Sequence, residues 1–316
     1  MASLSRRGKN KGEIKKMKNY YCKYLPTDLN LYLTSICNFN CSFCKRASGE
    51  ISKVRDVTPK IVEEILTRFP IKTCCIAGFG EPFASRRLFS VVEKLNSYKI
   101  KPSIITNGSL IKRRFNGIKR SELLYINVSL NTFTKERHKE ITGIDCFEEI
   151  LSGIEMLMEY ASFPVTISMV VLKTNYKEIP EFLKLVRSFK DAKAVLLNTL
   201  PYTEEVFEGI IKENDIAIVK EIESYKKLPE ANIVRTWPRY LKKYTGGLCN
   251  SPWTSIGIDG EGNITGCRRV NGPNPKYGNI YSKDPWNSKY LLELRKSIKE
   301  KEGYYHYQCK RCFGNG

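Results

Sequence analysis

Several features that would mark other classes of protein are scarce or missing in this chain of 316 residues. It has only two histidines, so a zinc site built on histidine is not expected. No run approaches the ~20 apolar residues of a membrane-spanning helix, and the basic N-terminus lacks the apolar core of a signal peptide. Eleven cysteines are too sparse for a disulfide scaffold, and an odd number excludes complete pairing. These absences predict a cytoplasmic protein with reduced thiols.

Negative charge is also in deficit. The net charge is +20, from 53 Lys and Arg against 33 Asp and Glu, and residues 1–20 contribute +6 of it. A polybasic arm is typical of disorder, and charge spread over the rest of a chain is typical of a solvated surface. Attraction of an anionic substrate or of RNA is the alternative. No basic motif interleaved with aromatic residues is present, so nucleic acid is not expected as a partner.

Short apolar segments alternate with amphipathic ones from Asp28 onward. Strands are expected at 29–36, 73–79, 103–106, 124–130, 165–172 and 194–198. Helices are expected near 59–69, 87–98, 147–160 and 176–190, with further helical stretches through 206–228. Six strands alternating with helices predict an α/β fold with a parallel sheet, whose ligand sites lie at the carboxyl ends of the strands.

The chain changes character near residue 236, where turn residues become frequent. Strand-like 255–258 and 263–265 are joined by Asp259-Gly-Glu-Gly262, a hairpin signal. A helix pattern follows at 289–300. We therefore expect a flexible arm over 1–24, a large α/β domain over 25–235 and a small α+β domain over 236–316.

The first expected strand is followed by three cysteines spaced C-x3-C-x2-C, namely Cys37, Cys41 and Cys44. Three thiolates can hold a four-iron cluster and leave one iron without a protein ligand, and an open metal position is where chemistry takes place. The alternative is a set of buried or zinc-bound thiols. A zinc ribbon would need a second CxxC within roughly 15 to 20 residues, whereas the next cysteines are the adjacent Cys74 and Cys75.

This run, with the aromatic Phe43 before the third cysteine, resembles the radical S-adenosylmethionine (radical SAM) superfamily. The resemblance implies a partial (β/α)6 TIM-like barrel and a catalytic 4Fe-4S cluster on the three cysteines. It also implies that S-adenosylmethionine binds at the open iron and is reductively cleaved to a 5'-deoxyadenosyl radical. An external electron donor such as flavodoxin or ferredoxin would then be a partner.

Two further segments resemble cosubstrate motifs of that superfamily. The run from Ala77 to Pro82 is similar to its GGEP motif, which implies that Gly78, Gly80 and Glu81 meet the methionine amino group, although Phe79 replaces a glycine. Ser129 and Asn131 end the fourth expected strand, where relatives contact the ribose; for Asn131 an ordinary polar strand end is the alternative. Thr142 stands where relatives often have arginine, which puts that contact in doubt.

The C-terminal domain holds a second group of cysteines: Cys249, Cys267, Cys309 and Cys312. Four thiolates in two pairs can complete the coordination of a metal, and a structural zinc site is one outcome. The spacing C-x12-G-x4-C, with Gly262 as the glycine, followed by CxxC resembles the SPASM/twitch extension of radical SAM enzymes. The chain stops four residues after Cys312, so we expect the twitch form with one auxiliary 4Fe-4S cluster.

These patterns leave three interpretations of function. The first is a radical SAM oxidoreductase that dehydrogenates a small sugar-like or aminocyclitol-like metabolite, or a related epimerase. The second is a radical SAM enzyme that modifies a peptide or protein side chain, and the third is a cysteine-rich zinc protein that binds RNA. Asn198, Tyr202, Asn250 and Arg268 could face a substrate, but each is more often a loop or surface residue. The sequence does not identify the substrate.

Overall fold

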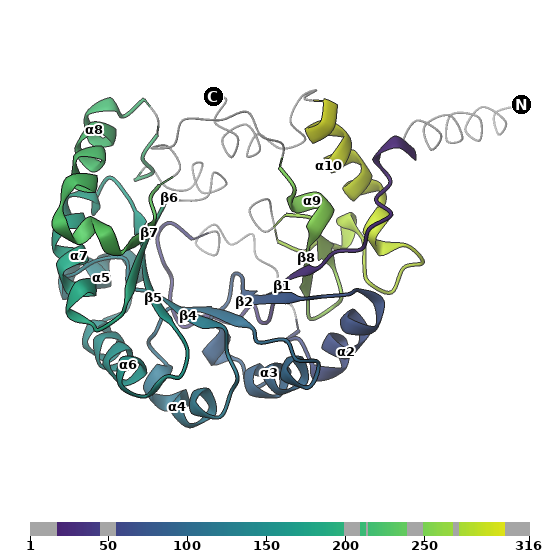
Figure 1. The fold of residues 1–316 in the computed structure, drawn as a ribbon, viewed down its shortest axis with the longest axis horizontal. Helices are drawn as coiled ribbons and strands as arrows, with labels where there is room; N and C mark the ends of the chain where they lie inside the picture. Colours follow the sequence, from purple (N-terminus) through teal and green to yellow (C-terminus); the bar gives the residue numbers. More distant parts are fainter. Residues whose placement is uncertain are drawn as a thin grey trace, which may run out of the picture.

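The computed structural model describes residues 18–44, 55–198, 209–212, 214–238, 249–267 and 272–300 (Figure 1). Its strands form one nine-stranded sheet in the order β7-β6-β5-β4-β3-β2-β1-β8-β9. Six strands lie where the α/β alternation predicted them: β1 (Asp28–Tyr32), β2 (Thr73–Ala77), β3 (Ser103–Thr106), β4 (Tyr125–Ser129), β5 (Val165–Val171) and β6 (Lys193–Asn198). A seventh parallel strand, β7 (Val234–Thr236), was not predicted. The hairpin strands are β8 (Ser255–Asp259) and β9 (Ile264–Thr265).

The sheet is parallel from β7 to β8, and β9 is antiparallel to β8. Helices connect the parallel strands: α2 (Pro59–Arg68), α3 (Leu88–Ser97), α4 (Ile111–Lys119), α5 (Lys135–Thr142), α6 (Phe147–Tyr160), α7 (Ile179–Ser188) and α8 (Ile216–Ser224). Figure 1 shows the sheet curved into an open horseshoe with these helices on its outer side. This is the predicted partial barrel, and its strand alternation places one face of the sheet against the helices and the other toward the interior.

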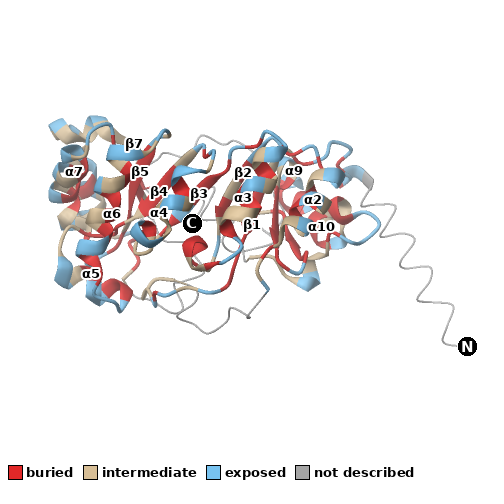
Figure 2. Ribbon diagram, turned by 90° about the horizontal axis from the view of Figure 1, so that it is seen from below, coloured by how far each residue is buried: buried red, intermediate tan, exposed pale blue. Residues whose placement is uncertain are grey.

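The outer face of the sheet supplies the hydrophobic core. Ile126 and Val128 of β4 are fully buried, as are Ile167 and Met169 of β5. They pack with helix residues such as Ile150 in one continuous cluster, seen as the buried band in Figure 2. Removal of this apolar area from water is the main stabilising term.

The C-terminal segment extends the same sheet. Strand β8 pairs in parallel with β1, so that Asp28 lies opposite Ser255 and Tyr32 opposite Asp259. The predicted hairpin is confirmed: Asp259 Oδ1 accepts the Glu261 and Asn263 amides, each at 2.9 Å. The short α9 (Ser251–Thr254) precedes β8, and α10 (Lys289–Glu300) has the predicted bounds. The domain boundary at 235/236 itself stays a prediction.

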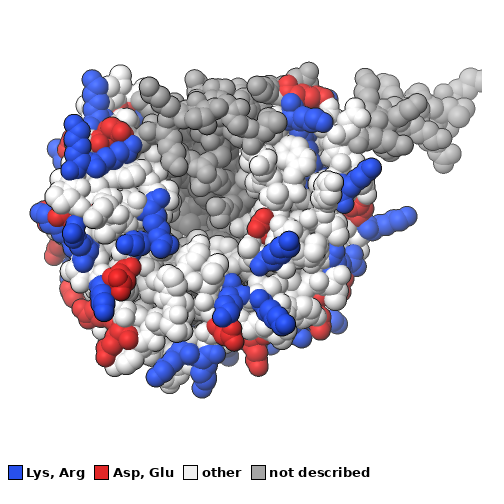
Figure 3. Space-filling view, viewed as in Figure 1, with Lys and Arg blue, Asp and Glu red and all other residues white. Residues whose placement is uncertain are grey.

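Charged groups follow the expectation of a solvated surface. Figure 3 shows Lys and Arg distributed around the outer rim of this face, interspersed with Asp and Glu rather than gathered in one patch. Among the described residues, no helix is long and apolar enough to cross a membrane. Most of the basic arm, residues 1–17, lies outside the described residues.

Candidate functional site

The three predicted cluster ligands lie on the loop that leaves the carboxyl end of β1. A turn is closed by the Cys44 amide, which donates to the Cys41 carbonyl oxygen at 3.0 Å, and Phe43 lies half-buried within it. The Phe39 amide points at Cys37 Sγ from 3.4 Å, and Asn107 Nδ2 lies 4.0 Å from the same sulfur.

The electrostatic interactions of Cys41 with the other two cysteines show that the three thiols lie near one another. Burial raises the pKa of Cys41, and charges on Cys44 and Cys37 raise it further. A metal must therefore supply the driving force for deprotonation at this position. No three Cys, His, Asp or Glu side chains in the described segments converge on one point as the ligands of a single ion would. A four-iron cluster accepts wider spacing because each cysteine binds a different iron, so the donor set fits such a cluster.

The glycine-containing run follows β2 and packs against the same loop. A Cβ on Gly80 would lie 2.3 Å from the Thr34 carbonyl oxygen, so only glycine allows this approach to the segment that leads into Cys37. The backbone of Gly78 has φ 142°, and a Cβ there would lie 2.8 Å from the Tyr32 ring. The ring of Phe79 reaches the C-terminal segment, where it lies against Gly272.

Glu81 is almost fully buried and is held by three hydrogen bonds. Its Oε1 accepts from the Phe83 amide at 3.0 Å and from Thr106 Oγ1 at 2.7 Å, and its Oε2 accepts from the Asn107 amide at 2.7 Å. Burial raises its pKa to about 6. The carboxylate therefore ties the end of β2 to the end of β3, and its contact with a methionine amino group stays a prediction.

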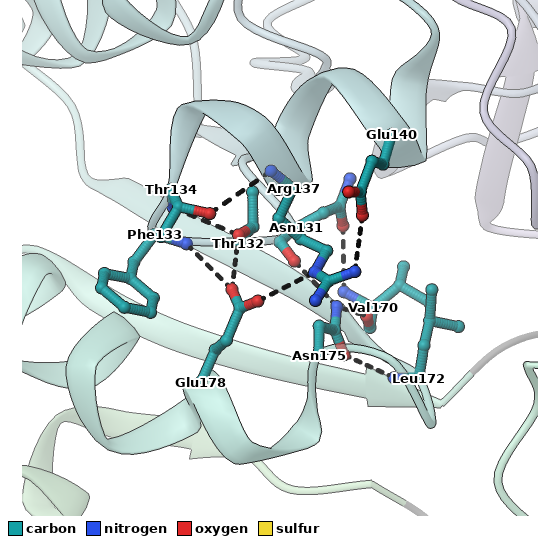
Figure 4. Close-up of polar contacts among 10 residues, drawn as sticks. All are labelled: Asn131, Thr132, Phe133, Thr134, Arg137, Glu140, Val170, Leu172, Asn175 and Glu178. Atoms are coloured by element: carbon teal, nitrogen blue, oxygen red, sulfur yellow. Dashed lines mark hydrogen bonds and ion pairs between the residues drawn. The ribbon is translucent and has the colours of Figure 1, made fainter.

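The predicted ribose contacts lie at the end of β4. Ser129 is half-buried, and its Oγ lies 3.4 Å from Ser168 Oγ. Asn131 adopts the left-handed region with φ 67°, and its Oδ1 accepts from the Val170 amide at 3.0 Å (Figure 4). This bond ties the side chain of Asn131 to β5, and its contact with a ribose stays a prediction.

Thr142 has a structural role in the described part of the chain. It is fully buried, and its hydroxyl donates to the His138 carbonyl oxygen at 2.8 Å and accepts from the Ile144 amide at 3.2 Å. These bonds hold the hydroxyl at the C-terminal end of α5. The doubt about a cosubstrate contact at this position stays a prediction.

The predicted auxiliary ligands are described in part. Cys249 precedes α9 and Cys267 follows β9, and Ser251 Oγ bonds to the Gly266 carbonyl oxygen at 3.4 Å, so the two cysteine segments are adjacent. They lie at the end of the hairpin that is beside the start of β1. The predicted catalytic triad, by contrast, follows the end of β1. Cys309, Cys312, Tyr202, Arg268 and the side chain of Asn198 lie outside the described residues.

The structure adds one residue to this site. Asn107, which follows β3, is not among the site residues predicted from the sequence. Its Nδ2 bonds to Asn38 Oδ1 at 2.9 Å besides facing the Cys37 sulfur, so it joins the β3 loop to the cysteine loop. Its position at the carboxyl end of a parallel strand was the available signal.

Comparison with known proteins assigns both parts of the chain. A family model described as the radical SAM superfamily matches residues 31–186, and one described as an iron-sulfur cluster-binding domain matches residues 249–313. The second match includes all four predicted auxiliary ligands. The pair of models implies a 4Fe-4S cluster with S-adenosylmethionine and an auxiliary iron-sulfur cluster.

Among curated proteins, the chain resembles several that are named probable GTP 3',8-cyclase. The protein from Thermococcus kodakarensis is 34% identical over 150 residues, which are 46% of this chain and 48% of that protein. The protein from Methanocaldococcus jannaschii is 28% identical over 222 residues, 68% of this chain and 72% of that protein. The chain thus spans about half the length of the first and under three quarters of the second.

Solved structures agree on the fold. Streptococcus suis SuiB bound to precursor peptide SuiA matches with a TM-score of 0.69 at 17% identity, covering 96% of this chain and 80% of that one. The structure of anSMEcpe with bound AdoMet and a peptide matches with a TM-score of 0.65 at 21% identity, covering 91% and 86%. From the two family-model matches and the cysteine loop at the end of β1, the chain belongs to the radical SAM superfamily, in its SPASM/twitch branch.

Proposed function

We propose that this enzyme is a radical SAM oxidoreductase that dehydrogenates a small hydroxylated metabolite of the sugar or aminocyclitol type. The chemistry that the bound cluster and S-adenosylmethionine supply is a 5'-deoxyadenosyl radical, which takes a hydrogen atom from a substrate carbon. Oxidation of a hydroxyl-bearing carbon to a carbonyl is complete when the substrate also loses one electron and one proton. An auxiliary cluster held by Cys249, Cys267, Cys309 and Cys312 would supply an acceptor for that electron, and water would take the proton.

The observation that carries this proposal is the polar lining on the inner face of β4 and β5. Asn127 Nδ2 donates to Thr166 Oγ1 at 2.9 Å, and Ser168 Oγ donates to Asn127 Oδ1 at 2.7 Å. Ser168 then reaches Ser129 at 3.4 Å. Neighbours one residue away, such as Val128 and Ile167, face the helices, so these polar groups face the interior. Uncharged hydroxyl and amide groups suit a neutral, hydroxylated substrate.

The test is SAM-dependent turnover of candidate polyols, sugars and aminocyclitols in deuterated water. We expect one S-adenosylmethionine consumed per oxidised product and no solvent deuterium at the reacting carbon. Thr166→Val keeps the side-chain shape and removes the hydroxyl, so it should raise KM, while Ser97→Ala on the exposed side of α3 should not. Stereoinverted product carrying one deuterium would refute dehydrogenation and indicate an epimerase.

The named relatives favour a second candidate, cyclisation of GTP. A contact between GTP and Lys193 requires that the nucleotide reach the amino ends of these strands, because Lys193 begins β6 and lies opposite Thr166 on the same face of the sheet. If GTP is the substrate, it should be consumed with formation of a cyclised nucleotide, and Lys193→Met should weaken its binding. Turnover of a polyol but not of GTP would exclude this candidate. Peptides belong in the same panel, because the solved structures with this fold include peptide complexes.

A further inference from the structure

The loop that carries the cysteine triad, residues 37–44, is bound to the C-terminal end of α5. The Asn40 amide donates to the Thr142 carbonyl oxygen at 3.0 Å, and the Ser42 amide donates to the Ile141 carbonyl oxygen at 2.9 Å. The last carbonyl groups of a helix have no partner within the helix. The end of α5 therefore supplies acceptors to a loop that has no partner strand of its own.

His138 is the centre of the packing beneath this loop. It is fully buried, and its ring meets Phe39 edge-on with centroids 5.7 Å apart and Phe147 at 5.9 Å. Its Nε2 lies 3.6 Å from Cys146 Sγ. Phe39 belongs to the triad loop, whereas Phe147 and Cys146 lie at the start of α6. The imidazole thus fills the space between the loop and the helices behind it.

Helix α5 is itself fixed to the barrel, as Figure 4 shows. At its N-terminus Thr134 Oγ1 accepts the Arg137 amide at 3.3 Å. Arg137 Nε forms an ion pair with Glu178 Oε1 at 3.2 Å, and the other oxygen of Glu178 accepts from Thr132. The helix is therefore clamped between the end of β4 and the segment that follows β5, and its other end meets the triad loop.

We propose that α5 is the platform that positions the cluster loop, and that His138 is its positioning residue through contact with Phe39. On this account His138 touches neither substrate nor cofactor. Burial lowers its pKa, so the imidazole is neutral, and an uncharged ring of similar shape should replace it. The inference rests on the proposed assignment of Cys37, Cys41 and Cys44 as cluster ligands.

The test compares amide hydrogen exchange and electron paramagnetic resonance of reconstituted protein. We expect His138→Ala to accelerate exchange at Asn40 and Ser42 at least tenfold, while amides of β4 and β5 keep their protection. The spectrum of the reduced SAM-binding cluster should broaden and the yield of 5'-deoxyadenosine should fall. His138→Phe should restore both protection and spectrum, because it retains the ring contacts.

The control is Ile154→Ala, which removes a fully buried side chain from α6. It should lower global stability without selective exchange at Asn40 and Ser42. Equal protection in wild type and His138→Ala, or selective loss in Ile154→Ala as well, would overturn the proposal. If His138→Ala does not fold, Phe39→Leu tests the same contact from the loop side and should give the same selective exchange. Hydrogen exchange does not depend on which reaction the enzyme catalyses. A negative exchange result would therefore refute the role of α5 and His138 without bearing on the proposed function.

Discussion

The carboxylate of Glu81 joins the end of β2 to the end of β3 through its hydrogen bonds. Its pKa of about 6 lies above the ordinary 4.5 because the group is buried, so the folded state holds the proton more tightly than the unfolded chain. Its contribution to stability is present below about pH 4.5 and is lost as the pH rises through about 6. The loss amounts to roughly 2 kcal/mol, from 1.36 kcal/mol per pKa unit.

Glu81→Gln should remove this dependence. Denaturant unfolding of variant and wild type at a series of pH values should show the wild type losing roughly 2 kcal/mol relative to the variant between pH 4 and 7. The hydrogen bonds that remain in the variant do not change how its free energy of unfolding varies with pH, because they form equally at every pH. Parallel curves for the two proteins would refute a raised pKa at Glu81.

At the scale of elements, Asn175 joins the segment after β5 to two strand ends. It is fully buried, its Nδ2 donates to the carbonyl oxygens of Asn131 and Val170, and its Oδ1 accepts the Leu172 amide at 2.7 Å. Asn175→Ala should cost about 3 kcal/mol in the free energy of unfolding, because it leaves buried backbone groups unpaired.

Asn96 provides the matched control for Asn175. It makes the same kind of bonds, to Ile100 and Glu122, but at the surface. Asn96→Ala should cost about 1 kcal/mol or less, since water can replace the side chain. Equal losses in the two variants would show that burial does not set the cost at Asn175.

Elements with strong periodicity could be predicted from the sequence, and weakly patterned ones could not. Helices α6 and α10 have the predicted bounds, because apolar residues recur along one face. Helix α5 was missed because seven of its eight residues are charged or polar and its buried face is His138, Ile141 and Thr142. Its signals were the cap Thr134 and the left-handed Gly143.

The candidate site, too, could be predicted only in part from the sequence. The order of the cysteine triad, the glycine run and the polar end of β4 along the chain predicted that these segments meet at the carboxyl ends of the strands. What the sequence could not predict is how each side chain is engaged. The three bonds to Glu81 and the approach of Phe79 to Gly272 depend on contacts between segments far apart in the chain.

For the whole molecule, the C-terminal cysteines predict a second cluster. Anaerobically reconstituted wild-type protein should carry about eight irons per chain in two clusters. Replacement of Cys249, Cys267, Cys309 and Cys312 with alanine should leave about four irons and the SAM-binding cluster's paramagnetic signal. About four irons with one zinc in the wild type would instead identify a structural zinc site.

The central claim is that Cys37, Cys41 and Cys44 hold the cluster that cleaves S-adenosylmethionine. The most direct test is to measure 5'-deoxyadenosine after anaerobic reduction in the presence of S-adenosylmethionine. Wild-type protein should form it, and the variant with all three cysteines replaced by alanine should form none while it retains about four irons per chain in the auxiliary cluster. Continued reductive formation of 5'-deoxyadenosine by that variant would contradict the account.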